Sequence, residues 1–168
     1  MKVKSAQIDH TKLGVGLHLV ETLDGDISVY DLRMIKPVQN NRDALYVLFA
    51  DEIHTMEHLL AFYLREVAES CGFKPEDILT VYPYGCQTGF GCLAKVPAKV
   101  FKNLLSKALY ECLNTDSIPF CDSKLCGNVF LNDFIGAKRR IKDFLITLDH
   151  QTDESILEVP LVEECAQS

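Results

Sequence analysis

Two histidines and a glutamate lie close enough together to bind and use a metal ion. They form the run His54-Thr55-Met56-Glu57-His58, an H-x-x-E-H pattern. Because residues four apart lie on one face of a helix, the imidazoles of His54 and His58 can bind the same ion. Glu57 then lies beside that ion, where it can carry protons without being a ligand, an ordering known from inverted zinc peptidases. The alternative is that all three are ordinary surface residues of a helix.

Two imidazoles leave a metal site incomplete. A third protein ligand with one open position is the catalytic arrangement, and four protein ligands form a structural site. Carboxylates, seven cysteines and three more histidines are formally available, and spacing alone does not choose among them. Cys126 is a reasonable candidate, because Gly127 after it permits a close approach to an ion.

A second segment with possible chemistry is the turn around Cys86, between Gly85 and Gly89. A cysteine at a glycine-flanked turn can be exposed near backbone N–H groups or near a metal, and such surroundings favour the thiolate as base or nucleophile. On the residues alone, a buried cysteine in an ordinary hairpin loop is the favoured interpretation.

The remaining pattern predicts the elements that position these groups. Turn residues, including Asp24-Gly25, and apolar runs predict strands at residues 15–22, 27–35, 78–82 and 90–96, with a further short strand inside 43–50. Three- and four-residue spacing predicts helices at 52–71, ending at Gly72, at 97–113, opened by Pro97, and at 132–148. We therefore expect an α+β fold: an antiparallel sheet packed against three to four helices in a single compact domain. Residues 1–150 would form the catalytic domain, and residues 151–168 an acidic C-terminal tail.

Composition limits the partners and the compartment. The 168 residues carry 17 basic and 24 acidic side chains, a net charge of −7, which argues against nucleic acid as a ligand. No apolar run is long enough to cross a bilayer, and no signal segment follows Met1. An odd number of cysteines without a C-x-x-C pair suits a reducing compartment. We expect a cytoplasmic protein with no membrane or nucleic-acid partner.

Several short motifs, taken in order, resemble the S-ribosylhomocysteine lyase family, the LuxS-type autoinducer-2 synthases. The resemblance runs from about residue 5 to residue 148. Its anchors are Ile8-Asp9-His10-Thr11-Lys12, Tyr30-Asp31-Leu32-Arg33 with Pro37, residues 54–65, Gly85-Cys86-Gln87-Thr88-Gly89-Phe90, Cys126-Gly127-Asn128 and Gly136-Ala137-Lys138. Each anchor is short, but their shared order and spacing are very specific.

The resemblance implies a function and a set of site residues. Its metal ligands would be His54, His58 and Cys126, holding Fe(II) in the cell, with zinc or cobalt as substitutes and no organic cofactor. The reaction would release homocysteine and 4,5-dihydroxypentane-2,3-dione, the autoinducer-2 precursor, by carbonyl migration and β-elimination. The family forms homodimers with active sites at the subunit interface. By position, the acid/base groups are Glu57 and Cys86, the ribose pocket contains Ser5, His10 and Arg33, and Arg65 lies near the homocysteine end.

Four positions depart from the family pattern. Thr80 replaces a usual aspartate, Val38 an asparagine, Tyr84 a methionine and Gly91 an aromatic residue. None removes a metal ligand or an acid/base group, so the departures concern substrate affinity. Two alternatives stay open: a metallopeptidase-like hydrolase, in which Glu57 would activate a metal-bound water, and a non-catalytic metal-binding relic of the lyase.

Overall fold

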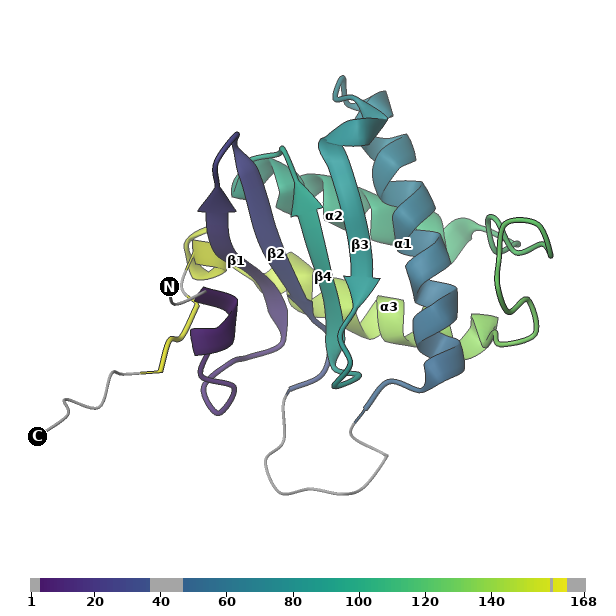
Figure 1. The fold of residues 1–168 in the computed structure, drawn as a ribbon, viewed down its shortest axis with the longest axis horizontal. Helices are drawn as coiled ribbons and strands as arrows, with labels where there is room; N and C mark the ends of the chain where they lie inside the picture. The colour runs from purple at the N-terminus through teal and green to yellow at the C-terminus, as the bar shows by residue number, and fades with distance from the viewer. Residues whose placement is uncertain (1–3, 37–46, 158, 163–168) are drawn as a thin grey trace, which may run out of the picture.

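A four-stranded antiparallel sheet forms the centre of the molecule, in a computed structural model that describes residues 4–36, 47–157 and 159–162. The strands lie in the order β1-β2-β4-β3 (Figure 1). Their bounds are β1 Gly16–Leu23, β2 Ile27–Arg33, β3 Ile78–Pro83 and β4 Gly89–Ala94. The β1–β2 hairpin turns through Gly25 and Asp26, both with positive φ.

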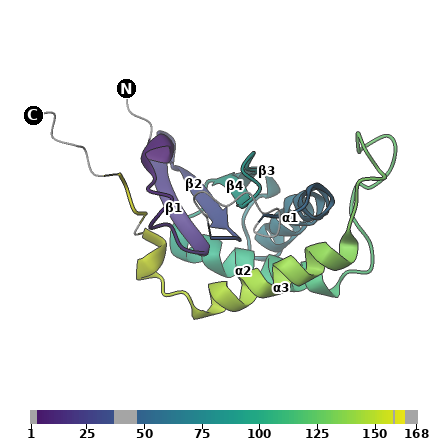
Figure 2. The same cartoon turned by 90° about the horizontal axis from the view of Figure 1, so that it is seen from below.

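Three long helices complete the fold: α1 Ala50–Ser70, α2 Ala98–Asn114 and α3 Phe134–His150. Helices α2 and α3 cover one face of the sheet, and α1 lies beside the edge strand β3 (Figures 1 and 2). Short 3-10 turns occur at Lys4–Gln7 (η1), Pro75–Asp77 (η3) and Glu154–Leu157 (η4). Within the described residues no helix is both long and apolar enough to span a bilayer.

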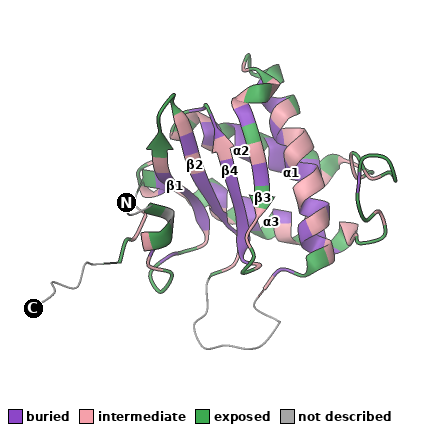
Figure 3. Cartoon of the chain, in the orientation of Figure 1, coloured by how far each residue is buried: buried purple, intermediate pink, exposed green. Residues whose placement is uncertain are grey.

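The core lies between the sheet and its covering helices. Tyr30 of β2 is fully buried and stacks on Phe101 of α2, with ring centroids 4.1 Å apart. Burial extends along most of β2 and β4 (Figure 3). Because side chains alternate along a strand, Asp31 and Arg33 project from the other face, away from α2 and α3. That second face carries part of the candidate site.

The predicted fold class is confirmed, since the chain forms one α+β domain with an antiparallel sheet and three long helices. Element ends differ from the prediction by at most two residues. Pro97 is the N-cap of α2 and precedes its first turn. The strand predicted within 43–50 is not observed in its described part, because residues 47–49 make no strand and the helix begins at Ala50; residues 43–46 lie outside the described residues.

The described part of the tail packs against β1. The side chain of Gln151 accepts a hydrogen bond from Leu17 N (2.8 Å) and donates one to Leu17 O (2.7 Å). Ile156 is fully buried, and Leu161 pairs with Ile8. The acidic segment therefore contributes apolar contacts as well as charge.

Candidate metal centre and adjoining cavity

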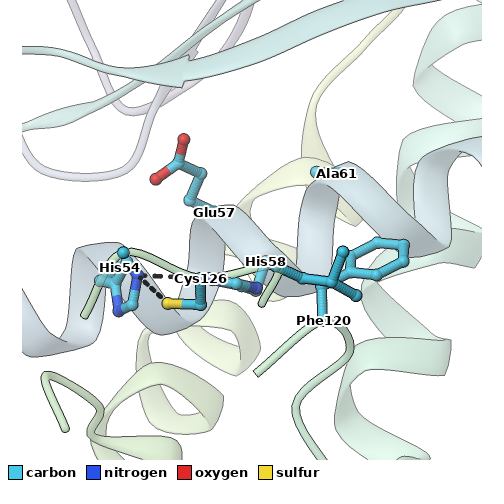
Figure 4. A pocket seen from close by; sticks show the side chains of 8 residues that line it. His54, Glu57, His58, Ala61, Phe120 and Cys126 are labelled. Carbon is cyan, nitrogen blue, oxygen red and sulfur yellow. Dashed lines mark hydrogen bonds between the residues drawn. The ribbon is translucent and has the colours of Figure 1, made fainter. Parts of the chain in front are cut away.

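Three potential metal ligands meet on the surface of α1. His54 and His58 are one helical turn apart, and their Nε2 atoms lie 3.2 Å from each other. The thiol of Cys126, buried in the loop between α2 and α3, lies 3.3 Å from His54 Nε2 (Figure 4). Within the described residues these three groups form a cluster that could hold a metal ion. The structure thus brings together the ligands implied by the resemblance.

Backbone carbonyls fix which nitrogen of each imidazole faces this cluster. His54 Nδ1 lies 2.6 Å from Leu131 O, and His58 Nδ1 lies 2.8 Å from Pro119 O. A carbonyl oxygen only accepts hydrogen bonds, so each Nδ1 carries the proton and donates it. Each Nε2 is therefore left as a bare lone pair, the form that a metal ion requires.

The donor set fits a divalent metal ion. Two unprotonated Nε2 atoms at 3.2 Å repel each other unless a cation lies between them. Metal bonds of about 2.0–2.1 Å to nitrogen and 2.3 Å to sulfur place neighbouring ligands of a tetrahedral ion roughly 3.3–3.6 Å apart. The observed separations of 3.2 and 3.3 Å are close to these values. Two imidazoles and a thiolate suit a borderline-soft ion such as Zn(II), Fe(II) or Co(II).

A cavity of about 350 Å³ opens beside the three ligands, lined also by Glu57, Ala61 and Phe120. Glu57 projects from α1 away from the ligand atoms (Figure 4). Its carboxylate makes no hydrogen bond or ion pair with any described residue. Glu57 thus borders the cavity as a half-buried, unengaged carboxylate, an arrangement suited to proton transfer.

A second cavity, of about 270 Å³, lies on the sheet face opposite α2 and α3. It is lined by Cys86 from the β3–β4 turn, by Arg33 and Asp31 from β2, and by His10 from the segment after η1. His10 is exposed, with Nδ1 donating to Ile8 O at 3.0 Å. The exposed thiol of Cys86 shows that the buried-cysteine interpretation of this turn is wrong.

A buried ion pair stands behind Cys86. Arg33 donates to Asp31 Oδ2 at 2.5 Å and to Thr88 Oγ1, and its Nη1 lies 3.8 Å from Cys86 Sγ. Thr88 Oγ1 is 3.0 Å from the same sulfur. Burial works against the charge of Arg33, but Asp31 outweighs it, so the pKa of Arg33 is raised. The thiol of Cys86 therefore lies beside a permanent positive charge.

Tyr84 covers this ion pair. The guanidinium carbon of Arg33 lies 4.7 Å from the centre of the Tyr84 ring, a cation–π contact. Burial, and then the charge of Asp31, raise the pKa of Tyr84, which keeps its phenol neutral. The departure at position 84 thus places a ring over Arg33.

Other predicted site positions lie elsewhere. Arg65 donates to Ala61 O (2.6 Å) and Leu79 O (3.2 Å) and does not line either cavity. Thr80 is half-buried on β3. Ser5 lies in η1, where its side chain is not described, and Val38 lies outside the described residues.

Sequence reasoning missed several residues that hold the groups around the two cavities in place. Asp31 and Thr88 contact Arg33, and Thr55 Oγ1 accepts from the backbone N–H of Asp133 at 3.0 Å, fixing the Cys126 loop to α1. Only Asp31 left a signal in the sequence, since an acid two residues before Arg33 shares its face of a strand. The two cavities have no lining residue in common.

Comparison with known families agrees with these features. The family model for S-ribosylhomocysteinase (LuxS) matches residues 3–155 of the 168. The matched region contains both cavities, the three clustered ligands and every predicted site residue. The chain therefore belongs to the LuxS family and is an S-ribosylhomocysteinase, a carbon–sulfur lyase.

Proposed function

We propose that this enzyme converts S-ribosylhomocysteine into homocysteine and 4,5-dihydroxypentane-2,3-dione, the autoinducer-2 precursor of quorum sensing and a by-product of the methyl cycle. The observation that carries the proposal is the convergence of His54 Nε2, His58 Nε2 and Cys126 Sγ beside the unengaged carboxylate of Glu57. A site with three protein ligands leaves a position open for substrate.

The ion would be held by His54, His58 and Cys126, with Fe(II) as the ion in the cell and Zn(II) or Co(II) as substitutes. When bound, it would act as a Lewis acid that polarises a carbonyl or hydroxyl oxygen of the open-chain sugar. The chain's own residues supply the proton transfers, and no organic cofactor takes part.

Cys86 and Glu57 divide the proton transfers between them. Cys86, as a thiolate beside Arg33 and Thr88, moves protons between neighbouring sugar carbons while the carbonyl migrates. Glu57 then takes the proton next to the migrated carbonyl, and the C–S electron pair leaves with homocysteine thiolate. The thioether bond is broken by β-elimination, so no water is consumed at the sulfur.

Substrate contacts follow from the second cavity. His10 and Arg33 share it with Cys86, which supports their assignment, with Ser5, to the ribose. Arg65 would bind the homocysteine end; its contact with Leu79 O places it at the start of β3, the end of that strand far from Cys86.

We further propose a homodimer whose active sites lie at the subunit interface. The Glu57 and Cys86 cavities are separate within one chain, and the reaction needs both groups at one sugar. Large exposed apolar side chains also gather in the loop that carries Cys126 and at the start of α3, as expected of an interface. They are Phe120 (47% exposed), Leu125 (65%), Phe130 (95%), Leu131 (38%) and Ile135 (84%).

The chain divides into a catalytic unit and a tail, and we place the enzyme in the cytoplasm. All proposed site residues fall within residues 1–150, which we take as the catalytic unit, with residues 151–168 as an accessory tail. A cytoplasmic location is supported by the cysteines, because all six in the described region are unpaired.

The decisive experiment measures thiol release from S-ribosylhomocysteine by protein purified without oxygen and loaded with Co(II) or Fe(II). We expect steady homocysteine release by the wild type, and a loss of at least about 100-fold in Glu57→Gln with metal content unchanged. Loss of metal from Glu57→Gln would show that Glu57 is a ligand. No release by folded, metal-filled wild type would favour the non-catalytic relic. A Cys86→Ala variant separates the peptidase alternative, since a peptidase would stay active without this thiol.

A further inference from the structure

The edge of the Cys86 cavity is formed by a tyrosine lying over a glycine. Tyr82 of β3 and Gly91 of β4 are cross-strand partners. A Cβ placed on Gly91 would come within 2.5 Å of Tyr82 Oη and 2.6 Å of Cε2, far inside van der Waals contact. The Tyr82 ring therefore occupies the space that any side chain at position 91 would need. Glycine within a strand commonly marks such a close approach.

The position of this ring is linked to the reactive thiol. Tyr82 meets Tyr84 edge to face, with ring centroids 6.1 Å apart. Tyr84 in turn lies on the guanidinium of Arg33, which contacts Thr88 and approaches Cys86. Asp31 pairs with Gly91 on the other side of β4, so the ring also faces the buried carboxylate. A shift of Tyr82 would thus be transmitted to the groups around Cys86.

Two polar atoms under these rings have no partner. Asp31 Oδ1 and Arg33 Nε are buried and make no hydrogen bond within the described region. Both residues line the cavity and are almost fully buried. Unpartnered buried polar atoms in residues that line a cavity favour a polar ligand there, and a sugar hydroxyl both donates and accepts hydrogen bonds. The cavity therefore suits a polar ligand, and the Tyr82 ring forms an apolar wall beside it.

We propose that Tyr82 is the aromatic wall of this sugar-binding cavity and a specificity-determining residue of the lyase, with Gly91 required to make room for its ring. The inference rests on the proposed function. Because the missing side chain at position 91 points into the same space, a ring supplied from position 91 can replace one supplied from position 82. An enzyme with a small residue at position 82 and an aromatic residue at position 91 should therefore work about as well as the wild type.

The test is a double-mutant cycle on the metal-loaded enzyme. Tyr82→Ser should raise KM roughly tenfold with little change in kcat, since the ring contributes binding energy in ground and transition states alike. Gly91→Tyr should lower kcat/KM by about 100-fold, because two rings compete for one space. The double variant should return to within about fivefold of wild type, as expected for residues in contact. Tyr82→Phe, which keeps the ring, should stay within about twofold of wild type.

Controls distinguish a substrate-binding role of Tyr82 from a purely structural one. Tyr110→Ser removes an exposed tyrosine of α2 that lines neither cavity, and should change neither KM nor kcat. If Gly91→Tyr does not fold, Gly91→Ala with and without Tyr82→Ser gives the same cycle, because even a methyl group meets the ring. Additive losses, or equal effects on kcat from all variants with KM unchanged, would overturn the proposal.

A second readout does not need turnover. The rate of Cys86 alkylation by iodoacetamide should rise about threefold when Tyr82→Ser opens the cavity edge and should return toward the wild-type rate in the double variant. An inactive wild type would contradict the proposed function, whereas an alkylation rate equal in all four proteins would contradict the wall. The two failures are thereby distinguished.

Discussion

The residues of the metal cluster are each held by a second contact that sets their chemistry. The carbonyls of Leu131 and Pro119 take the Nδ1 protons of the two histidines, and Asn128 N–H lies 3.4 Å from the Cys126 sulfur. Such outer contacts fix ring orientation and tautomer before any ion binds. The three potential ligand atoms are therefore held in position before any ion binds.

We expect His58→Ala to lose its metal. With one imidazole gone, only two protein ligands remain, and metal content should fall from about one ion per chain to below about 0.1. Metal content is measured by elemental analysis after gel filtration. The matched control is His150→Ala, whose ring also bonds a carbonyl within its helix (2.7 Å) but lies outside the cluster. Full metal retention by His58→Ala would refute the ligand assignment.

Residue types and spacing predicted half of this site. The four-residue separation of His54 and His58 places two donors on one helix face, and that inference needs no tertiary information. Cys126 lies 68 residues beyond His58 in a loop, so the residues alone made it one candidate among several, and the family resemblance selected it. The carbonyls of Leu131 and Pro119 carry no side-chain signal at all. Backbone groups in irregular segments cannot be assigned from residue type.

At the scale of elements, α1 is anchored at the end that carries the cluster. Glu52, fully buried, accepts from Phe49 N at 3.0 Å and from Arg140 of α3 at 3.2 Å. The first contact satisfies an N–H group that the helix start leaves free. The second fixes α1 to α3 two residues before His54. The ion pair therefore holds the first turn of α1 in the position that brings His54 to the Cys126 loop.

Glu52→Gln should destabilise the protein by about 3 kcal/mol, because Arg140 would keep a half-buried charge with no carboxylate to pair with. The free energy of unfolding is measured by urea titration. Arg139→Ala is the matched control: Arg139 also contacts Glu52, at 3.4 Å, but its side chain is 66% exposed, so its loss should cost less than about 1 kcal/mol. Equal effects of the two changes would contradict an anchoring role.

Regular elements were predictable where their periodicity is strong. All three long helices and all four strands were expected from apolar spacing and turn residues, with errors only at their ends. The prediction failed at residues 47–49. A short apolar run shows no periodicity, so a strand cannot be distinguished there from a buried segment that leads into a helix. Leu48 is fully buried there without pairing in a strand. The packing of the described tail on β1 likewise had no local signal.

At the scale of the whole molecule, two buried thiols should make the free energy of unfolding fall at high pH. Burial raises the pKa of Cys92 and of Cys112 from 9.0 to about 12. Above about pH 9 the unfolded chain releases these protons while the folded protein keeps them, so folding stability is fully present below pH 9 and falls as the pH rises toward 12. Urea unfolding at pH 8 and 10.5 should show the loss. The loss should be smaller in Cys112→Ala and unchanged in Cys71→Ala, whose thiol is exposed. Equal stability of the wild type at both pH values would contradict the predicted effect of the buried thiols.

The arrangement of active sites is a property of the assembly, and mixing inactive chains tests it. Glu57→Gln and Cys86→Ala should each be inactive alone. If a site takes Glu57 from one subunit and Cys86 from its partner, a mixed dimer contains one site with both groups intact and one with neither. Random pairing of equal amounts makes half of the dimers mixed, so about a quarter of wild-type activity should return.

This recovery requires mixed dimers to form. Co-expression of the two chains with different affinity tags ensures that they do. Dimers carrying both tags are isolated, and about half of the wild-type activity per dimer is expected in that fraction. If both groups of a site came from one chain, every site in the mixed dimer would lack one of them, and no activity would return. The separation of the two cavities in a single chain favours recovery, because in the proposed reaction one sugar must reach both Glu57 and Cys86.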